Sequence, residues 1–75
     1  MKVIIKQEVK LGSGMTMNVY KYENEEQLSK FVDEDADWFT KVHIPIDEME
    51  IYEDEATICG GDYNISYYIE EVERR

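Results

Sequence analysis

The sequence predicts one small α+β domain, in which an antiparallel or mixed sheet of four or five strands carries one helix on one face. Two alternating apolar and polar stretches near the N-terminus predict strands, and one central stretch with apolar residues at helical spacing predicts the helix. Short β-type stretches follow, which gives the order β-β-α-β-(β)-β. A chain of 75 residues buries only about 60–65% of its unfolded surface, so we expect a single domain over residues 1–75 with a small core.

The first predicted strand begins at Val3. Its apolar side chains fall mainly on one face, and charged side chains occupy most of the other; the apolar set is Val3, Ile5, Val9 and Leu11. Gly12 and Gly14 follow, and glycine adopts positive φ without a steric penalty. The sequence therefore predicts that a turn at residues 12–14 closes a hairpin.

The second predicted strand has large side chains on both faces. We expect Met15, Met17 and Val19, which alternate along the strand, to point into the core. Tyr20 and Tyr22 then fall on the opposite face. Either a bulge interrupts the strand, or the two tyrosines lie on the outer surface.

A helix is predicted over about residues 25–37. Asn24 and Gln27 resemble a capping box, and Glu25 and Glu26 suit the positive end of the helix dipole. The apolar positions recur at helical spacing, and they are Leu28, Phe31, Val32, Ala36 and Phe39. We expect this apolar stripe to cover one face of the sheet.

After the helix, alternation of Val42, Ile44 and Ile46 predicts a strand over about residues 42–46. Pro45 places that strand at a sheet edge or makes this its end. Residues 56–59 predict a further short strand, followed by a glycine-rich turn at residues 60–62.

The last segment fits two periodicities. Ile65, Tyr67 and Ile69 alternate as in a strand, whereas Ile65, Tyr68, Ile69 and Val72 also match one face of a helix. We favour the strand, because isoleucine and tyrosine concentrated directly after a turn are typical of β-structure.

Charge is distributed unevenly along the chain. The net charge is −10, and residues 23–55 hold thirteen carboxylates against Lys30 and Lys41, a local charge of −11. Such a field repels nucleic acid and anionic membranes and attracts basic partners. We therefore expect neither direct nucleic-acid binding nor membrane binding.

Candidate sites for metals or catalysis are incomplete in this sequence. Residues 33–37 have the alternating acids that open a calcium loop, but Trp38 and Ile44 occupy the positions where that loop needs Gly and Glu. His43 and Cys59 are far from the spacing of a zinc site, and a Cys–His catalytic pair would need an enclosed cleft. We expect a non-enzymatic protein that holds no metal or cofactor.

The single cysteine, Cys59, excludes an intrachain disulfide. The N-terminal apolar run is interrupted at Lys6, which leaves it shorter than a signal peptide or a membrane span requires. The sequence therefore predicts a cytoplasmic protein.

Two functional hypotheses follow from these patterns. In the first, carboxylates contact a basic, nucleic-acid-binding surface of a partner protein; they are Asp33, Glu34, Asp37, Asp47, Glu48, Glu50, Glu53, Asp54 and Glu55. In size and charge the chain resembles the small acidic inhibitors that phages and mobile elements direct at restriction and CRISPR enzymes. In the alternative, a tyrosine-rich sheet face that includes Tyr20 and Tyr68 mediates assembly of an accessory or homo-oligomeric domain, and the acidity serves solubility.

Overall fold

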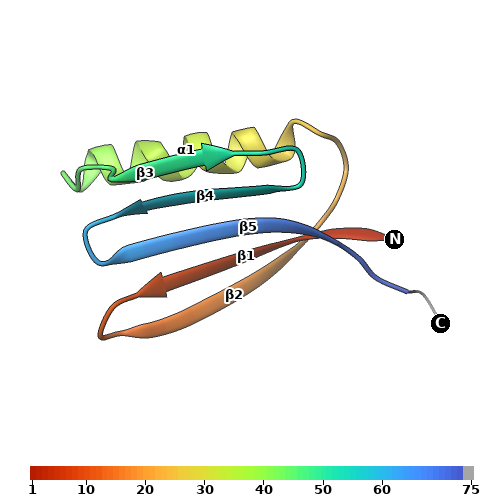
Figure 1. Ribbon diagram of the computed structural model, residues 1–75, viewed down its shortest axis with the longest axis horizontal. Helices are drawn as coiled ribbons and strands as arrows, with labels where there is room; N and C mark the ends of the chain where they lie inside the picture. Colours follow the sequence, from red (N-terminus) through yellow and green to blue (C-terminus); the bar gives the residue numbers. More distant parts are fainter. Residues whose placement is uncertain (74–75) are drawn as a thin grey trace.

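A computed structural model of the protein describes residues 1–73 and confirms the predicted fold class. Five strands form one antiparallel sheet in the order β2-β1-β5-β4-β3, and one helix packs against it (Figure 1). The elements are β1 Lys2–Lys10, β2 Gly14–Lys21, α1 Gln27–Lys41, β3 Glu48–Ile51, β4 Glu55–Gly60 and β5 Tyr63–Glu71. Among these residues no helix is both long and apolar enough to cross a membrane.

The core lies between α1 and the face of the sheet that α1 covers, here called the helix face. Its fully buried large side chains come from the helix and from three strands, and they are Ile4, Val32, Phe39, Ile58, Ile65 and Tyr67. Removing such a side chain from water contributes about 1.5–3 kcal/mol. The other side of the sheet, here called the open face, has no covering layer within residues 1–73.

Three local hairpins and one long-range pairing build the sheet. β1 pairs with β2, β3 with β4, and β4 with β5, each across a short turn. β1 and β5 then pair side by side in the centre, from Lys2 opposite Glu71 to Lys10 opposite Tyr63. This central seam places β2 and β3 at the two edges of the sheet.

The N-terminal hairpin is confirmed, but the expected inward side of β2 is wrong. Gly12 and Gly14 have φ values of 83° and 101°, as the turn requires. Tyr20 faces α1, with its ring centroid 4.9 Å from that of Phe31, and Tyr22 packs beside the core. The other set of side chains therefore lies on the open face, and it consists of Met15, Met17 and Val19, all exposed. The strand pairs in regular register without a bulge.

The helix begins and ends later than predicted. Gln27 is its first residue, and the Gln27 side chain accepts hydrogen bonds from the backbone N–H groups of Glu23 and Asn24, at 2.6 and 3.1 Å. The helix then continues to Lys41. Its apolar stripe is confirmed, because Leu28, Val32 and Phe39 are buried and Phe31 and Ala36 pack beside them.

The predicted strand over residues 42–46 is wrong, because this segment is the turn and loop after the helix. His43 has a φ of 60°, and its N–H donates to Thr40 O at 3.2 Å. Ile44 N–H donates to Phe39 O at 2.9 Å. This pair of bonds is a Schellman motif, which ends the helix and reverses the chain. The edge strand is instead β3, which begins at Glu48.

The C-terminal segment forms a strand, as favoured above. β5 pairs with both β1 and β4, and the predicted short strand at residues 56–59 is part of β4. Gly61, with a φ of 56°, lies in the two-residue turn between β4 and β5. Gly60 has a different reason to be glycine, since a Cβ there would collide with the carbonyl oxygen of Pro45 in the loop above it.

Candidate functional site

Nine exposed carboxylates lie along the side of the molecule that α1, β3 and the turn after β3 form. We call this surface the acidic edge, and it comprises Asp33, Glu34, Asp37, Asp47, Glu48, Glu50, Glu53, Asp54 and Glu55. Three of them come from α1 and six from residues 47–55. Because α1 packs against β4 and the edge strand β3, these two stretches of the chain share one side of the domain (Figure 1).

The helical part of the acidic edge follows from the spacing of the apolar stripe. Val32 and Phe39 turn one side of α1 into the core, so Asp33, Glu34 and Asp37 project to solvent. The solvent side of the helix therefore presents these three carboxylates together with the exposed Lys30 and Lys41.

The strand part of the acidic edge lies on the other side of the sheet. Glu48 and Glu50 are opposite Cys59 and Thr57 of β4, which alternate with the buried residues Ala56 and Ile58. Glu48 and Glu50 therefore point to the open face, while α1 covers the helix face. The acidic edge thus wraps around the β3 side of the sheet from one face to the other.

A tight turn holds the carboxylates between β3 and β4. Tyr52 N–H donates to Glu55 O at 2.7 Å, which brings Glu53 and Asp54 to the end of the hairpin. Ile69 N–H of β5 donates to Asp54 O at 3.0 Å and fixes this turn against the sheet. The backbone of this part of the acidic edge is therefore fixed, while its side chains are exposed.

Within residues 1–73 the structure has two ion pairs, and neither involves a residue of the acidic edge. One joins the N-terminal ammonium to Glu71 at 2.9 Å, and the other joins Lys6 to Asp35 at 3.2 Å.

The negative charges of the acidic edge also shift the pKa values of neighbouring groups. A hydrogen bond to Glu50 and the charge of Glu50 raise the pKa of Tyr52. Desolvation, followed by the charges of Glu48 and Asp47, raises the pKa of the Cys59 thiol.

Tyr20 and Tyr68, the two aromatic residues of the predicted site, lie on opposite faces of the sheet. Tyr20 is on the helix face of edge strand β2 and is 36% exposed. Tyr68 is half-buried on the open face, opposite Ile5 of β1 and Glu55 of β4. The fold places Tyr68 beside the acidic edge, and it places Tyr20 in β2, at the opposite edge of the sheet from β3.

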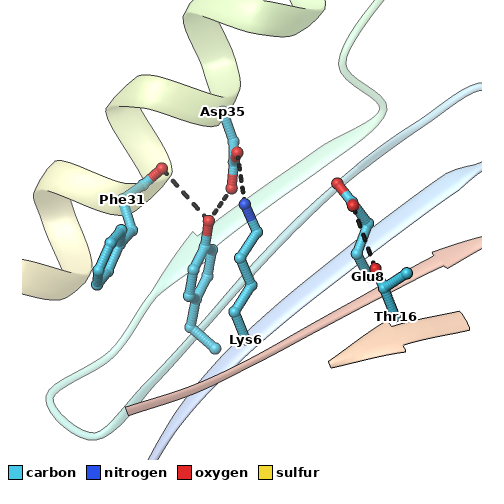
Figure 2. A network of polar contacts seen from close by, with 6 residues as sticks. Lys6, Glu8, Thr16, Phe31 and Asp35 are labelled. Carbon is cyan, nitrogen blue, oxygen red and sulfur yellow. Dashed lines mark hydrogen bonds and ion pairs between the residues drawn. The ribbon is translucent and has the colours of Figure 1, made fainter. Parts of the chain in front are cut away.

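A polar cluster that the sequence analysis did not find joins α1 to the sheet. Figure 2 shows Lys6 of β1 reaching towards Asp35 of α1, with its Nζ 3.2 Å from Asp35 Oδ1. The hydroxyl of Tyr67 in β5 donates a hydrogen bond to Asp35 Oδ2 and lies 3.5 Å from the carbonyl oxygen of Phe31. Lys6 also stands over the Tyr67 ring, 5.5 Å from its centroid. The charges and hydroxyl satisfy one another, so the cluster fixes the helix on the sheet.

Asp35 is the helical acid whose environment differs from that of the acidic edge. Its side chain is 13% exposed, whereas Asp33 and Asp37 on either side are exposed residues. Desolvation raises the pKa of Asp35, with smaller contributions from the charges of Glu8 and Glu34, while the Lys6 ammonium acts in the opposite direction. The sequence contains a signal for the placement of Asp35 on the side of α1 that faces the sheet. Asp35 is three residues after Val32 and four before Phe39, which is the spacing of one helix face.

The residues examined above for metal binding or nucleophilic chemistry are dispersed in the fold. Asp33 and Asp37 point to solvent and Asp35 points to Lys6, because all three lie in α1 rather than in a loop. His43 caps the end of the helix, whereas Cys59 is on the open face with its sulfur 3.9 Å from Glu48 Oε2. Across residues 1–73 no three His, Cys, Asp or Glu side chains are placed so that they could hold a metal ion together.

Comparisons of the chain with protein-family models, with curated proteins and with solved structures found no match. The acidic edge is the surface on which charge, exposure and backbone order coincide.

Proposed function

We propose that this protein is a non-enzymatic binding protein whose acidic edge engages a basic surface of a partner protein, such as a nucleic-acid-binding groove. The observation that carries the proposal is the gathering of nine exposed carboxylates on one side of the fold, none of them in an ion pair within residues 1–73. Self-repulsion among these charges opposes folding, so the arrangement is costly to a small domain. Binding to clustered lysines and arginines offsets that cost.

The charge density of the acidic edge is the reason to propose nucleic-acid mimicry. Duplex DNA presents one negative charge per about 1.7 Å of axis, and proteins that bind DNA carry lysine and arginine rows to match. A compact domain that presents a dense row of carboxylates competes for the same side chains. The protein would then act as an inhibitor or regulator of its partner.

The shape of the acidic edge favours a groove over a flat partner surface. Asp33, Glu34 and Asp37 lie above the helix face, whereas Glu48 and Glu50 lie on the open face. A flat basic surface would contact one of these rows and leave the other in solvent. A groove that receives the β3 side of the sheet contacts both rows together.

The proposal is tested by removing charge from each row separately. One variant carries Asp33→Asn, Glu34→Gln and Asp37→Asn, and a second carries Glu48→Gln, Glu50→Gln and Glu55→Gln. A matched control removes three exposed carboxylates outside the acidic edge, with Asp62→Asn, Glu70→Gln and Glu73→Gln. All three variants change the net charge by the same amount.

Immobilised wild type and variants are compared for capture of partners from cell lysate at about 50 and about 300 mM salt, followed by elution with duplex DNA. We expect wild type and control to retain the same DNA-displaceable protein at low salt. With that partner purified, each acidic-edge variant should associate about tenfold more slowly, and this difference should shrink at high salt. Equal association by all three variants at low salt would rule out the acidic edge as the contact surface.

A further inference from the structure

The two edges of the sheet differ in length, charge and exposure. β3 has four residues, of which Glu48 and Glu50 are charged, and the loop before it contains Pro45. β2 has eight residues, and Lys21 at its end is the only charged one. Short edge strands with charges discourage pairing with another chain, whereas a long, nearly uncharged edge invites it. The β3 edge is therefore guarded against pairing with another chain, and the β2 edge is not.

The backbone of β2 has one hydrogen-bonding neighbour instead of two. It pairs with β1 from Lys21 to Gly14 in unbroken register, and after Gly14, whose φ is positive, no residue of β2 has a positive φ. On its outer side alternate N–H and C=O groups point away from the sheet. Every side chain of β2 is exposed as well, on both faces. The ligand that matches such an edge is another extended strand.

We propose that this strand is β2 of a second copy, paired antiparallel about a two-fold axis perpendicular to the sheet. Such an axis preserves the faces of the sheet, so open-face side chains of one copy meet open-face side chains of the other. With the axis at Met17 or at Asn18, Val19 lies opposite Met15 or Met17 of the second copy. The apolar pattern of β2 is therefore complementary to itself, and a foreign strand would have to reproduce it.

Charge separation favours the same arrangement. Each copy carries a net charge of −10, so association must keep the acidic edges apart. Joining two five-stranded sheets through β2 places the two β3 strands about 43 Å apart, at about 4.8 Å per strand. This distance is several times the Debye length of about 8 Å at physiological salt. The guarded β3 strands then form both ends of the joined sheet, so the assembly closes at two copies.

The test compares two methionine-to-lysine variants at opposite edges. Met17 in β2 and Met49 in β3 are 52% and 50% exposed, so Met17→Lys and Met49→Lys make the same chemical change at similar exposure. Analytical ultracentrifugation over a dilution series should show a dimer for wild type and for Met49→Lys. Met17→Lys places two lysines near the axis, so its dimer dissociation constant should rise about tenfold or more. Wild type that stays monomeric at the highest concentration, or equal weakening by both variants, would overturn the proposal.

A second measurement needs no variant. Amide hydrogen exchange on wild type should slow at alternate residues of β2 as protein concentration rises, because those N–H groups become bonded across the axis. A dimer in which no β2 amide gains protection would be packed through another surface and would contradict edge pairing. Salt separates this surface from the acidic edge, since screening should leave β2 pairing unchanged or stronger while it weakens partner binding.

Discussion

Asp35 shows how one residue in a row of similar acids acquires a different role. The helix turns Asp33 and Asp37 into solvent, but it turns Asp35 towards Lys6 and Tyr67. Removal from water penalises the carboxylate, and two hydrogen-bond donors partly offset that penalty. The raised pKa of Asp35 indicates that desolvation is the larger effect.

That shift predicts a pH dependence of folding. A carboxyl whose pKa is higher in the folded protein than in the unfolded chain favours folding when protonated, and the benefit is lost as pH rises through the folded-state pKa. The window therefore begins near 3.8, the ordinary value for Asp35, and extends upward. We expect the stability of wild type relative to Asp35→Asn to increase as pH falls from 7 towards 4, measured by urea denaturation.

Asp33→Asn is the matched control for this measurement, because it makes the same change two residues away in solvent. Its stability relative to wild type should vary little over the same pH range. A difference between wild type and Asp35→Asn that stays constant with pH would contradict the buried placement of Asp35.

At the scale of elements, the end of α1 depends on a residue in an unfavourable conformation. His43 has a φ of 60°, which costs a residue with a Cβ about 1–2 kcal/mol relative to right-handed conformations. Glycine adopts this conformation readily and is the usual residue at this position of a Schellman motif. His43→Gly should therefore raise the free energy of unfolding by about 1 kcal/mol, measured by chemical denaturation.

His43→Ala separates backbone conformation from loss of the imidazole, since alanine keeps the Cβ and should gain little. Similar stabilisation by both variants would mean that the histidine ring, and not its backbone, opposes folding.

The elements show where sequence patterns suffice and where they do not. The hairpin turn at Gly12 and Gly14 could be predicted because positive φ has a direct signature in glycine. Alternation separated Met17 from Tyr20 on β2, but it did not say which set faces the helix. The partner decided that, because Phe31 on α1 packs against Tyr20.

The short length of β3 explains why the edge strand was misplaced. β3 does alternate between charged and apolar residues, from Glu48 to Ile51, but four residues give a weak signal, and Val42, Ile44 and Ile46 alternate directly before them. The apolar residues Ile44 and Ile46 sit instead in the loop, where Ile44 packs beside the core.

The candidate site was predictable in composition but not in layout. The nine carboxylates are visible in the sequence, whereas their wrapping around the β3 edge depends on contacts between α1 and β3. The cluster of Lys6, Asp35 and Tyr67 likewise joins residues about thirty positions apart, which only the fold brings together.

For the whole molecule, charge predicts a response to salt. A net charge of −10 on 75 residues favours the expanded chain over the compact one. Raising sodium chloride from about 0.05 to about 0.5 M should therefore increase the free energy of unfolding, by about 1 kcal/mol. Urea is the suitable denaturant because it adds no ions, and the protein concentration is kept below the dissociation constant of the proposed dimer.

The variant with Asp33→Asn, Glu34→Gln and Asp37→Asn provides the comparison. With three fewer charges near one another, it should start more stable at low salt and gain less from added salt. Stability of wild type that is unchanged or falls over this range would contradict net repulsion in the folded state.

The central seam between β1 and β5 has a consequence for how the chain reaches this fold. The hairpin of β1 and β2 and the hairpin of β4 and β5 each need only neighbouring residues, so they can form quickly and independently. The seam pairs Lys10 with Tyr63 and Lys2 with Glu71. Forming it closes most of the chain into a loop, and the chain entropy lost in this step must be offset by the hydrogen bonds that form afterwards. During synthesis β1 therefore has one unpaired side until β5 has been made. The middle of the finished sheet is thus the part that is assembled last.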